Sequence, residues 1–404
     1  MTELLDLVVR WVHVIAGILW IGNSMLFNFL DRNLRPRPER DSYGDIWLIH
    51  SGGFYLMEKN RGERITNGVL RLPAPLHWFK WQAYTTWITG ALLLVLVYYY
   101  GARALLVDVG PGELSHARAT VLAVGVIVGG WAIYEVAWRT IGVRWPRVAT
   151  AVSVVALVSA IAALTAVLNG RAAFVHIGAL LGTIMAGNVA FTIMPSQRDL
   201  VMALEAGREP SQAIADRAKT RSIHNNYITF PVVALMVSAH FPLLYSRSAA
   251  ENAVLLVAGG GLVRHFMNTR FTDASWRWKL PATAALTVFL LVLSTGSGPF
   301  AVQPHANNVF SGGSDSTRLP DSVSWEDARR IIDRRCTACH SKTPSDISLG
   351  RTPAGVAFDT RAEVEAFRER ILVRAVEQRT MPPGNKTLMT ERDRALLLLW
   401  LTQK

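Results

Sequence analysis

Long apolar runs with few charges recur along most of the chain. Eight can be drawn, at residues 11–30, 81–100, 119–134, 148–170, 172–197, 222–245, 249–267 and 280–300. Most approach the roughly 20 residues that a helix needs to cross a hydrocarbon core of ~30 Å. The seventh is the weakest, because Glu251 and Arg264 shorten its uncharged part and three glycines lower its helix propensity. The pattern predicts a bundle of eight transmembrane helices over residues 1–300.

The pattern changes after the eighth run. Residues 301–322 are rich in Gly, Ser, Asn and Pro, which is typical of a flexible linker. Residues 323–404 then contain two amphipathic stretches, which open with Ser324 and Asp327 and with Thr390 and Asp393 at the spacing of a helix-capping box. We therefore expect an all-α chain in three parts: the bundle, the linker and a small C-terminal domain.

The cations of the chain are unevenly placed around the predicted spans. Half of the residues are hydrophobic, and the net charge is nevertheless +12. Twenty-one Lys and Arg residues lie in or beside one alternate set of loops, and five lie at the other ends. Because cytoplasmic loops retain Lys and Arg, this bias predicts that both termini are outside. The charge is explained by membrane topology, and we expect no nucleic acid as a partner.

Both cysteines of the chain lie in "CTACH", the pattern of covalent c-type haem attachment. Cys336 and Cys339 can bond to the two vinyl groups of a porphyrin, and His340 can supply an axial nitrogen to the iron. A zinc or redox site is the alternative, but zinc needs further Cys or His ligands. Since haem c is attached outside the bacterial inner membrane, this motif also predicts a periplasmic C-terminal domain.

The C-terminal domain, with two capped helices around this motif, resembles class I cytochromes c. In that family a methionine on a non-helical loop is the sixth iron ligand and raises the haem potential. Met381 precedes two prolines and has this setting, so the resemblance implies that it binds the iron. Met389 is the other candidate, and a core methionine is the structural alternative.

Histidines in membrane spans are costly and are functional candidates by default. Six lie in or beside the spans: His13, His77, His176, His224, His240 and His265. The stretches "VHVIAGILWIGN" and "VHIGALLGTIMAGN" are similar, which suggests two four-helix units related as a parallel repeat. The repeat predicts His13 and His176 at similar depth near the outer face, and His77 and His224 near the inner face. Hydrogen-bonded structural histidines are the alternative.

From this pattern we take His13, His176 and His224 as the catalytic candidates. His13 with His176 could bind a haem b or line a substrate site. Two other polar features are open to more than one interpretation. Glu135 and Arg139 have the spacing of a structural helix pair. The amides and hydroxyls of "RSIHNNYITFP" could bind the edge of a heterocycle or cap a helix.

The order of several motifs resembles one known family. They are "RWVHVIAGILWIGNSMLFNFLD", "LHWFKWQAYTTWITG", "IMPSQ", "HNNYITFPV", "CTACH" and "TMPPGN". Together they resemble the bacterial membrane-bound urate oxidases that carry a fused cytochrome c domain. The resemblance implies that urate is oxidised to 5-hydroxyisourate in purine degradation, with water supplying the oxygen and electrons passing to the c-type haem.

The resemblance leaves the downstream electron acceptor open, with a soluble cytochrome or a terminal oxidase as candidates. The alternative function is a quinone-linked membrane subunit that passes electrons between the membrane pool and the outer haem. It would require a partner enzyme, whereas a urate oxidase would act as a single chain. In both cases we expect a multi-pass protein in the lipid bilayer of the bacterial inner membrane.

Overall fold

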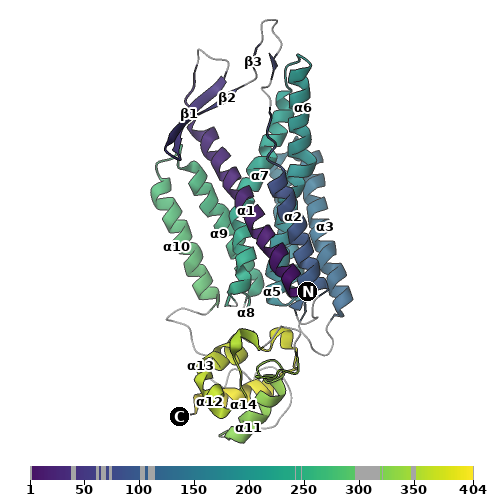
Figure 1. Ribbon diagram of the computed structural model, residues 1–404, viewed down its shortest axis with the longest axis vertical. Helices are drawn as coiled ribbons and strands as arrows, with labels where there is room; N and C mark the ends of the chain where they lie inside the picture. The colour runs from purple at the N-terminus through teal and green to yellow at the C-terminus, as the bar shows by residue number, and fades with distance from the viewer. Residues whose placement is uncertain are drawn as a thin grey trace.

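The computed structural model shows a mostly helical chain. It describes residues 2–37, 42–60, 63–64, 70–71, 75–100, 105–107, 114–241, 243–246, 248–295, 319–320, 322–346 and 352–403. Long helices lie side by side in a bundle, with β-hairpins at one end and a small helical domain at the other (Figure 1).

The bundle contains a long helical segment for each of the eight predicted spans. They are α1 (Thr2–Asn33), α2 (Trp81–Leu94) continued by the π-helical turn η1 (Val95–Tyr99), α3 (His116–Thr140), α4 (Pro146–Val167), α5 (Gly170–Asn188) continued by the π-helical turn η3 (Val189–Ile193) and by α6 (Met194–Glu205), α7 (Gln212–Val237), α9 (Ala249–Thr269) and α10 (Trp276–Thr295). A short turn η4 (Ser238–His240) and α8 (Leu243–Ser246) connect α7 to α9.

Five segments of the described residues are long and apolar enough to cross a membrane. They are Leu4–Asn33, His116–Thr140, Pro146–Val167, Gly170–Glu205 and Trp276–Thr295. The segments α2, α7 and α9 fall short of this measure, since α2 has 14 residues and polar side chains interrupt the other two. The structure therefore supports a helical membrane protein, and the count of eight spans stays a prediction.

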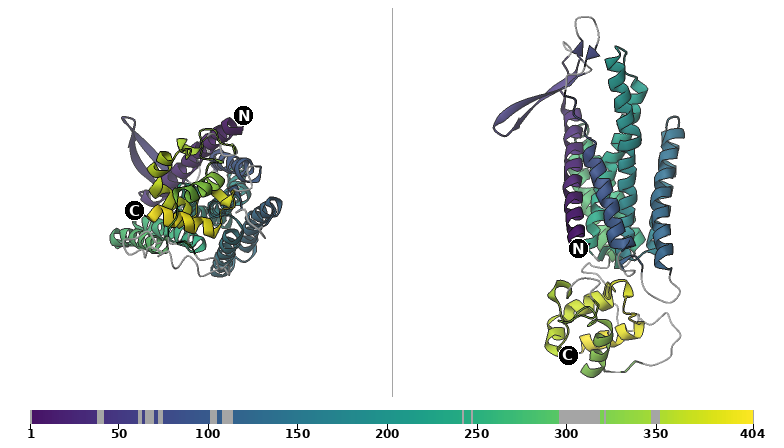
Figure 2. Two further views of the ribbon diagram at one scale, coloured as in Figure 1. Left: turned by 90° about the horizontal axis from the view of Figure 1, so that it is seen from below. Right: turned by 45° about the vertical axis from the view of Figure 1, so that its right-hand side comes forward.

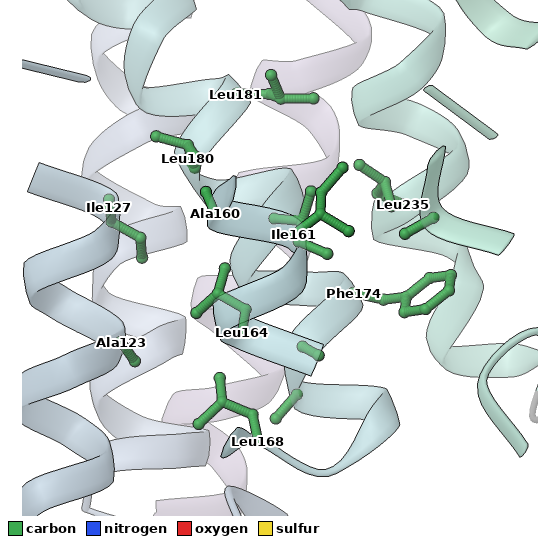
Figure 3. Packing of buried hydrophobic residues seen from close by; sticks show 14 of the residues in the cluster. Ala123, Ile127, Ala160, Ile161, Leu164, Leu168, Phe174, Leu180, Leu181 and Leu235 are labelled. Carbon is green, nitrogen blue, oxygen red and sulfur yellow. The ribbon is translucent and has the colours of Figure 1, made fainter. Parts of the chain in front are cut away.

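Helix α5 forms the centre of the bundle. In the segment Gly170–Glu205, which contains α5, 67% of the most apolar stretch is buried. In the other four apolar segments the buried share is 6–22%. Figure 3 shows Leu180, Leu181 and Phe174 of α5 among apolar side chains of α3, α4 and α7. Large apolar side chains on the outer surfaces of the surrounding helices stay exposed, as expected for surfaces that face lipid.

The first loop departs from the all-α prediction, which is wrong for this segment. Strands β1 (Ser42–His50) and β2 (Gly53–Asn60) form an antiparallel hairpin that projects away from α1 (Figure 2). A second short pair consists of β3 (Glu63–Arg64) and β4 (Leu70–Arg71). Ser51 and Gly52, at the turn of the first hairpin, have φ of 51° and 75°. This geometry suits a two-residue hairpin turn flanked by apolar strands.

The C-terminal domain is built from short helices around its own apolar core. They are α11 (Trp325–Arg335), α12 (Arg361–Ala366), α13 (Arg368–Ile371), η7 (Leu372–Glu377) and α14 (Glu391–Thr402), with the single turns η6 (Pro353–Gly355) and η8 (Pro383–Asn385). Ser324 caps α11, and Thr390 forms a capping box with Asp393 on α14, as predicted. The two helices contact each other, and the rings of Trp325 and Trp400 lie 5.4 Å apart.

The N-terminus and the C-terminal domain lie at the same end of the bundle (Figure 1). The hairpins and the far end of α6 lie at the opposite end. An even number of crossings gives this arrangement. Of the predicted linker, residues 301–318 and 321 lie outside the described residues.

Helices α9 and α10 approach most closely at Gly259, where a Cβ atom would lie 2.3 Å from Cγ2 of Thr287. Gly259→Ala should therefore destabilise the bundle by about 1–2 kcal/mol, because overpacking costs more than the gain in helix propensity. Gly261→Ala is the matched control, since no atom lies within 4 Å of its Cβ position. Thermal unfolding in detergent would test this, and equal effects of the two changes would contradict it.

Candidate functional site

Buried polar side chains from three helices meet inside the bundle, in what we call the Arg221 cluster. Its members come from α3, α5 and α7: Tyr134, Glu135, Asn188, Arg221, His224 and Asn225. The Tyr134 hydroxyl lies 2.7 Å from Nδ1 of His224. The amide nitrogen of Asn188 donates to that hydroxyl at 3.0 Å and to the amide oxygen of Asn225 at 2.8 Å. One asparagine of the central helix thus connects its two neighbours.

The charges of the Arg221 cluster are buried and paired. A carboxylate oxygen of Glu135 lies 3.0 Å from Nη2 of Arg221, and the other accepts from Nε of Arg139 at 2.5 Å. The Arg221 side chain is only 3% exposed, whereas that of Arg139 is 56% exposed. The Arg221 guanidinium also lies 4.9 Å from the centre of the Tyr134 ring. The buried Arg221–Glu135 pair is neutral, and the mostly exposed Arg139 adds one positive charge beside it.

Helical spacing explains why these residues face one another. Arg221, His224 and Asn225 are separated by three and four residues, so they share one face of α7. The α-helical hydrogen bonding of α5 changes at Asn188, where the π-helical turn η3 begins. Such turns often occur at functional sites. The motif "HNNY" therefore lies well inside a helix and does not cap one, which settles one of the two alternatives left open by the sequence.

The other face of α7 carries a second polar group, which we call the Asn226 network. It joins α1, α7 and α9 through Asn28, Arg32, Asn226, Arg264 and Asn268. The Asn226 amide oxygen accepts from Nε of Arg264 at 3.1 Å and from Asn268 at 2.8 Å. Asn28 then donates to Asn268 at 3.1 Å. This network holds the first helix against the second half of the bundle.

The predicted catalytic histidines do not form one site. His176 is fully buried; its Nδ1 lies 2.7 Å from the carbonyl oxygen of Ala172, and its Nε2 lies 3.1 Å from the Tyr99 hydroxyl. Nδ1 of His13 lies 2.9 Å from the carbonyl oxygen of Thr86. Thr86 and Tyr99 are 13 residues apart along α2 and η1, which is roughly 20 Å at 1.5 Å per residue.

The structure therefore does not bring His13 and His176 together at one depth, as the repeat had suggested. Nε2 of His176 is engaged by the Tyr99 hydroxyl, and the two histidines contact parts of the second span that lie roughly 20 Å apart, so the pair does not fit one haem b. Of the three candidates, only His224 belongs to the Arg221 cluster. His77 is exposed, lies before the start of α2 and contacts Phe79, so it is not part of the Arg221 cluster.

The predicted haem-attachment motif lies at the end of α11. The helix ends at Arg335, and the backbone N–H groups of Cys339 and His340 both donate to the carbonyl oxygen of Cys336. The motif is thus a turn that follows the helix. Burial raises the pKa of the Cys336 thiol to about 12 and also raises that of Cys339.

The donor groups near this turn fit a c-type haem. Nδ1 of His340 lies 2.9 Å from the carbonyl oxygen of Val356. Because a carbonyl can only accept, Nδ1 carries the proton, and Nε2 keeps its lone pair for a metal. Met381 packs partly buried at the edge of the domain core, whereas Met389 is 3% exposed within it. Two thiols, a free imidazole nitrogen and a thioether are what such a haem requires.

Comparison with protein families assigns the bundle. The family model described as urate oxidase N-terminal matches residues 1–295. The chain belongs to this family. The match ends at Thr295, the last residue of α10, so it covers the helical bundle and leaves the C-terminal domain outside. No curated protein and no solved structure matches the chain. The family supports a membrane protein with a urate-related oxidation role.

Sequence reasoning missed half of the Arg221 cluster, namely the roles of Tyr134, Asn188 and Arg221. Two signals were available: the i, i+3, i+4 spacing of Arg221, His224 and Asn225, and the equivalent spacing of Trp131, Tyr134 and Glu135. The Glu135–Arg139 ion pair was predicted and is confirmed.

Removing the carboxylate should reveal how strongly the cluster depends on it. Glu135→Ala leaves Arg221 buried without its counter-charge, so we expect a loss of about 3–5 kcal/mol in the free energy of unfolding. Arg139→Ala removes a mostly exposed partner and should cost at most about 1 kcal/mol. Chemical denaturation of the two variants in detergent measures the difference. A loss for Glu135→Ala as small as that for Arg139→Ala would show that the buried pair is not required.

Proposed function

We propose that this protein oxidises urate to 5-hydroxyisourate and passes the electrons to a c-type haem on its own C-terminal domain. The family match over residues 1–295 is the observation that carries the proposal, since it assigns the bundle to urate oxidation. The donor set around Cys336, Cys339 and His340 supports the electron acceptor. In balance, urate and water give 5-hydroxyisourate, two protons and two electrons.

The C-terminal domain would hold the haem through its own side chains. The thiols of Cys336 and Cys339 would form the two thioether bonds, and Nε2 of His340 would be one axial ligand. We propose Met381 as the second ligand, because Met389 lies deeper in the apolar core. When bound, the haem supplies one-electron acceptance. The Val356 carbonyl fixes the His340 ring in the tautomer that ligation needs.

We further propose that the bundle crosses the bacterial inner membrane eight times, with both termini periplasmic. The shared end of the N-terminus and the C-terminal domain supports an even number of crossings (Figure 1). The excess of loop cations at the other set of ends supports the direction. A soluble cytochrome or a terminal oxidase on the outer side would then accept the electrons.

Anaerobic mixing tests the reaction directly. Purified, oxidised protein mixed with urate should show rapid appearance of the reduced c-type haem band and stoichiometric loss of urate. Cys336→Ala and Cys339→Ala should lose covalent haem and most turnover. Reduction by a quinol but not by urate would overturn the proposal and favour the quinone-linked electron carrier. Normal urate turnover in a haem-free variant would overturn the electron path.

The assignment of the sixth ligand predicts a contrast between two methionines. Met381→Leu should lower the haem reduction potential, because loss of the thioether ligand removes the group that raises it. Met389→Leu keeps the volume of a buried core residue and should leave the potential unchanged. Redox titration of the haem band measures both. A lowered potential in Met389→Leu alone would transfer the ligand role to that residue.

A further inference from the structure

The Arg221 cluster and Trp131, one helical turn before Tyr134, leave buried hydrogen-bonding atoms without partners. Within the described part of the chain, Nη1 of Arg221, Oδ1 of Asn188 and Nε1 of Trp131 are buried and make no hydrogen bond. Each such atom costs free energy in an apolar interior unless a partner is supplied. Two are donors and one is an acceptor; Oε2 of Glu135 makes no hydrogen bond either, but it is in ion-pair contact with Arg221. A ligand with both kinds of group would satisfy them.

The residues that carry these three atoms are neighbours in the bundle. Trp131 lies three residues before Tyr134 on α3, so the two side chains share a face. A Cβ atom at Gly187, the neighbour of Asn188, would lie 2.4 Å from Nε1 of Trp131. The absence of a side chain at Gly187 thus lets α5 approach the indole closely. Asn188 and Arg221 both contact the Tyr134 ring or its hydroxyl.

The Asn226 network provides a contrast at the other face of α7. It also holds a buried arginine, since Arg264 is 4% exposed. Within the described residues, every buried side-chain nitrogen and oxygen atom of this network has a hydrogen-bond partner. Its hydrogen bonds are complete without a ligand, as expected of a structural contact. Of these two groups, the Arg221 cluster is the one that combines buried charge with hydrogen-bonding atoms that have no partner.

The chemistry of the Arg221 cluster favours a planar anion. The mostly exposed Arg139 guanidinium beside the neutral Arg221–Glu135 pair attracts a negative charge, and the buried guanidinium and indole N–H groups can donate to carbonyl oxygens or an anionic ring nitrogen. Oδ1 of Asn188 can accept from a ring N–H. The rings of Tyr134, His224 and Trp138 lie in contact, with 4.1 Å between the last two centres, and offer flat surfaces.

We propose that the Arg221 cluster binds the urate anion, an assignment that rests on the proposed function. Arg221 and Trp131 donate to the oxygens or the anionic nitrogen of urate, and Asn188 accepts from one of its N–H groups. Glu135 lies five residues before the end of α3, and Arg139 is mostly exposed. The cluster is therefore reached from the end of the bundle that carries the hairpins, and urate enters there.

Binding without turnover isolates this site from the electron path. Dithionite-reduced protein in lipid nanodiscs is dialysed anaerobically against radiolabelled urate, so that the reduced haem accepts no electrons. Arg221→Gln should raise the Kd at least about tenfold, since a charged hydrogen bond is lost. Arg221→Lys keeps the charge, so its Kd should lie between those of Arg221→Gln and wild type. Trp131→Phe removes only the indole N–H and should raise the Kd several-fold.

Arg264→Gln is the matched control, because it neutralises a similarly buried arginine in the Asn226 network. Its Kd should stay within about twofold of wild type. Haem content and thermal unfolding show that each variant is folded; Arg221→Gln keeps the Glu135–Arg139 ion pair, which limits the damage. Trp131→Phe provides a further folded variant if Arg221→Gln is unstable.

Two outcomes overturn the assignment of the site while leaving the proposed function intact. In the first, Trp131→Phe and Arg221→Lys are folded and bind urate with the wild-type Kd, while urate still reduces the haem of the wild-type protein. In the second, Arg264→Gln raises the Kd for urate as much as Arg221→Gln does, which would show that urate does not bind preferentially at the Arg221 cluster. If wild-type protein neither binds urate nor is reduced by it, the proposed function itself fails, and this site falls with it.

Discussion

The burial of an arginine and a glutamate inside an apolar bundle constrains much of this structure. An unpaired charge at such depth costs several kcal/mol, so Arg221 of α7 and Glu135 of α3 have to stay within contact. This requirement fixes the register of the two helices, with α5 between α3 and α7 as the central element. The next turn of α7 then places His224 and Asn225 against Tyr134 and Asn188, and the opposite face presents Asn226 to α9.

Local signals were sufficient to predict the helices, and non-local ones were not available. Hydropathy located all eight long helical segments, and capping spacing located the starts of α11 and α14. The hydrogen bond between Asn188 and Tyr134 joins residues 54 positions apart, and no local pattern specifies such a contact. The hairpin is different, because its apolar strands on either side of Ser51 and Gly52 are a local signal for this structure.

The two similar histidine motifs show why sequence similarity does not predict the depth of a residue in the bundle. His13 lies 11 residues after the start of α1, whereas His176 lies six residues after the start of α5. Similar motifs therefore occur at different distances from the helix ends. The neighbours differ as well, because α5 is central and α1 is peripheral. His176 is fully enclosed, and His13 packs against Gly90 and Thr86 of α2.

The two halves of the proposed reaction lie at opposite ends of the central helix. Asn188 is 18 residues from Gly170, which is about 27 Å along α5, and the C-terminal domain lies beyond that end. Urate gives up two electrons, whereas one c-type haem accepts one at a time. If urate binds at the Arg221 cluster, the half-oxidised substrate has to remain bound between the two transfers. A buried site with a fixed guanidinium serves this need, because it retains the charged ring and limits its contact with water.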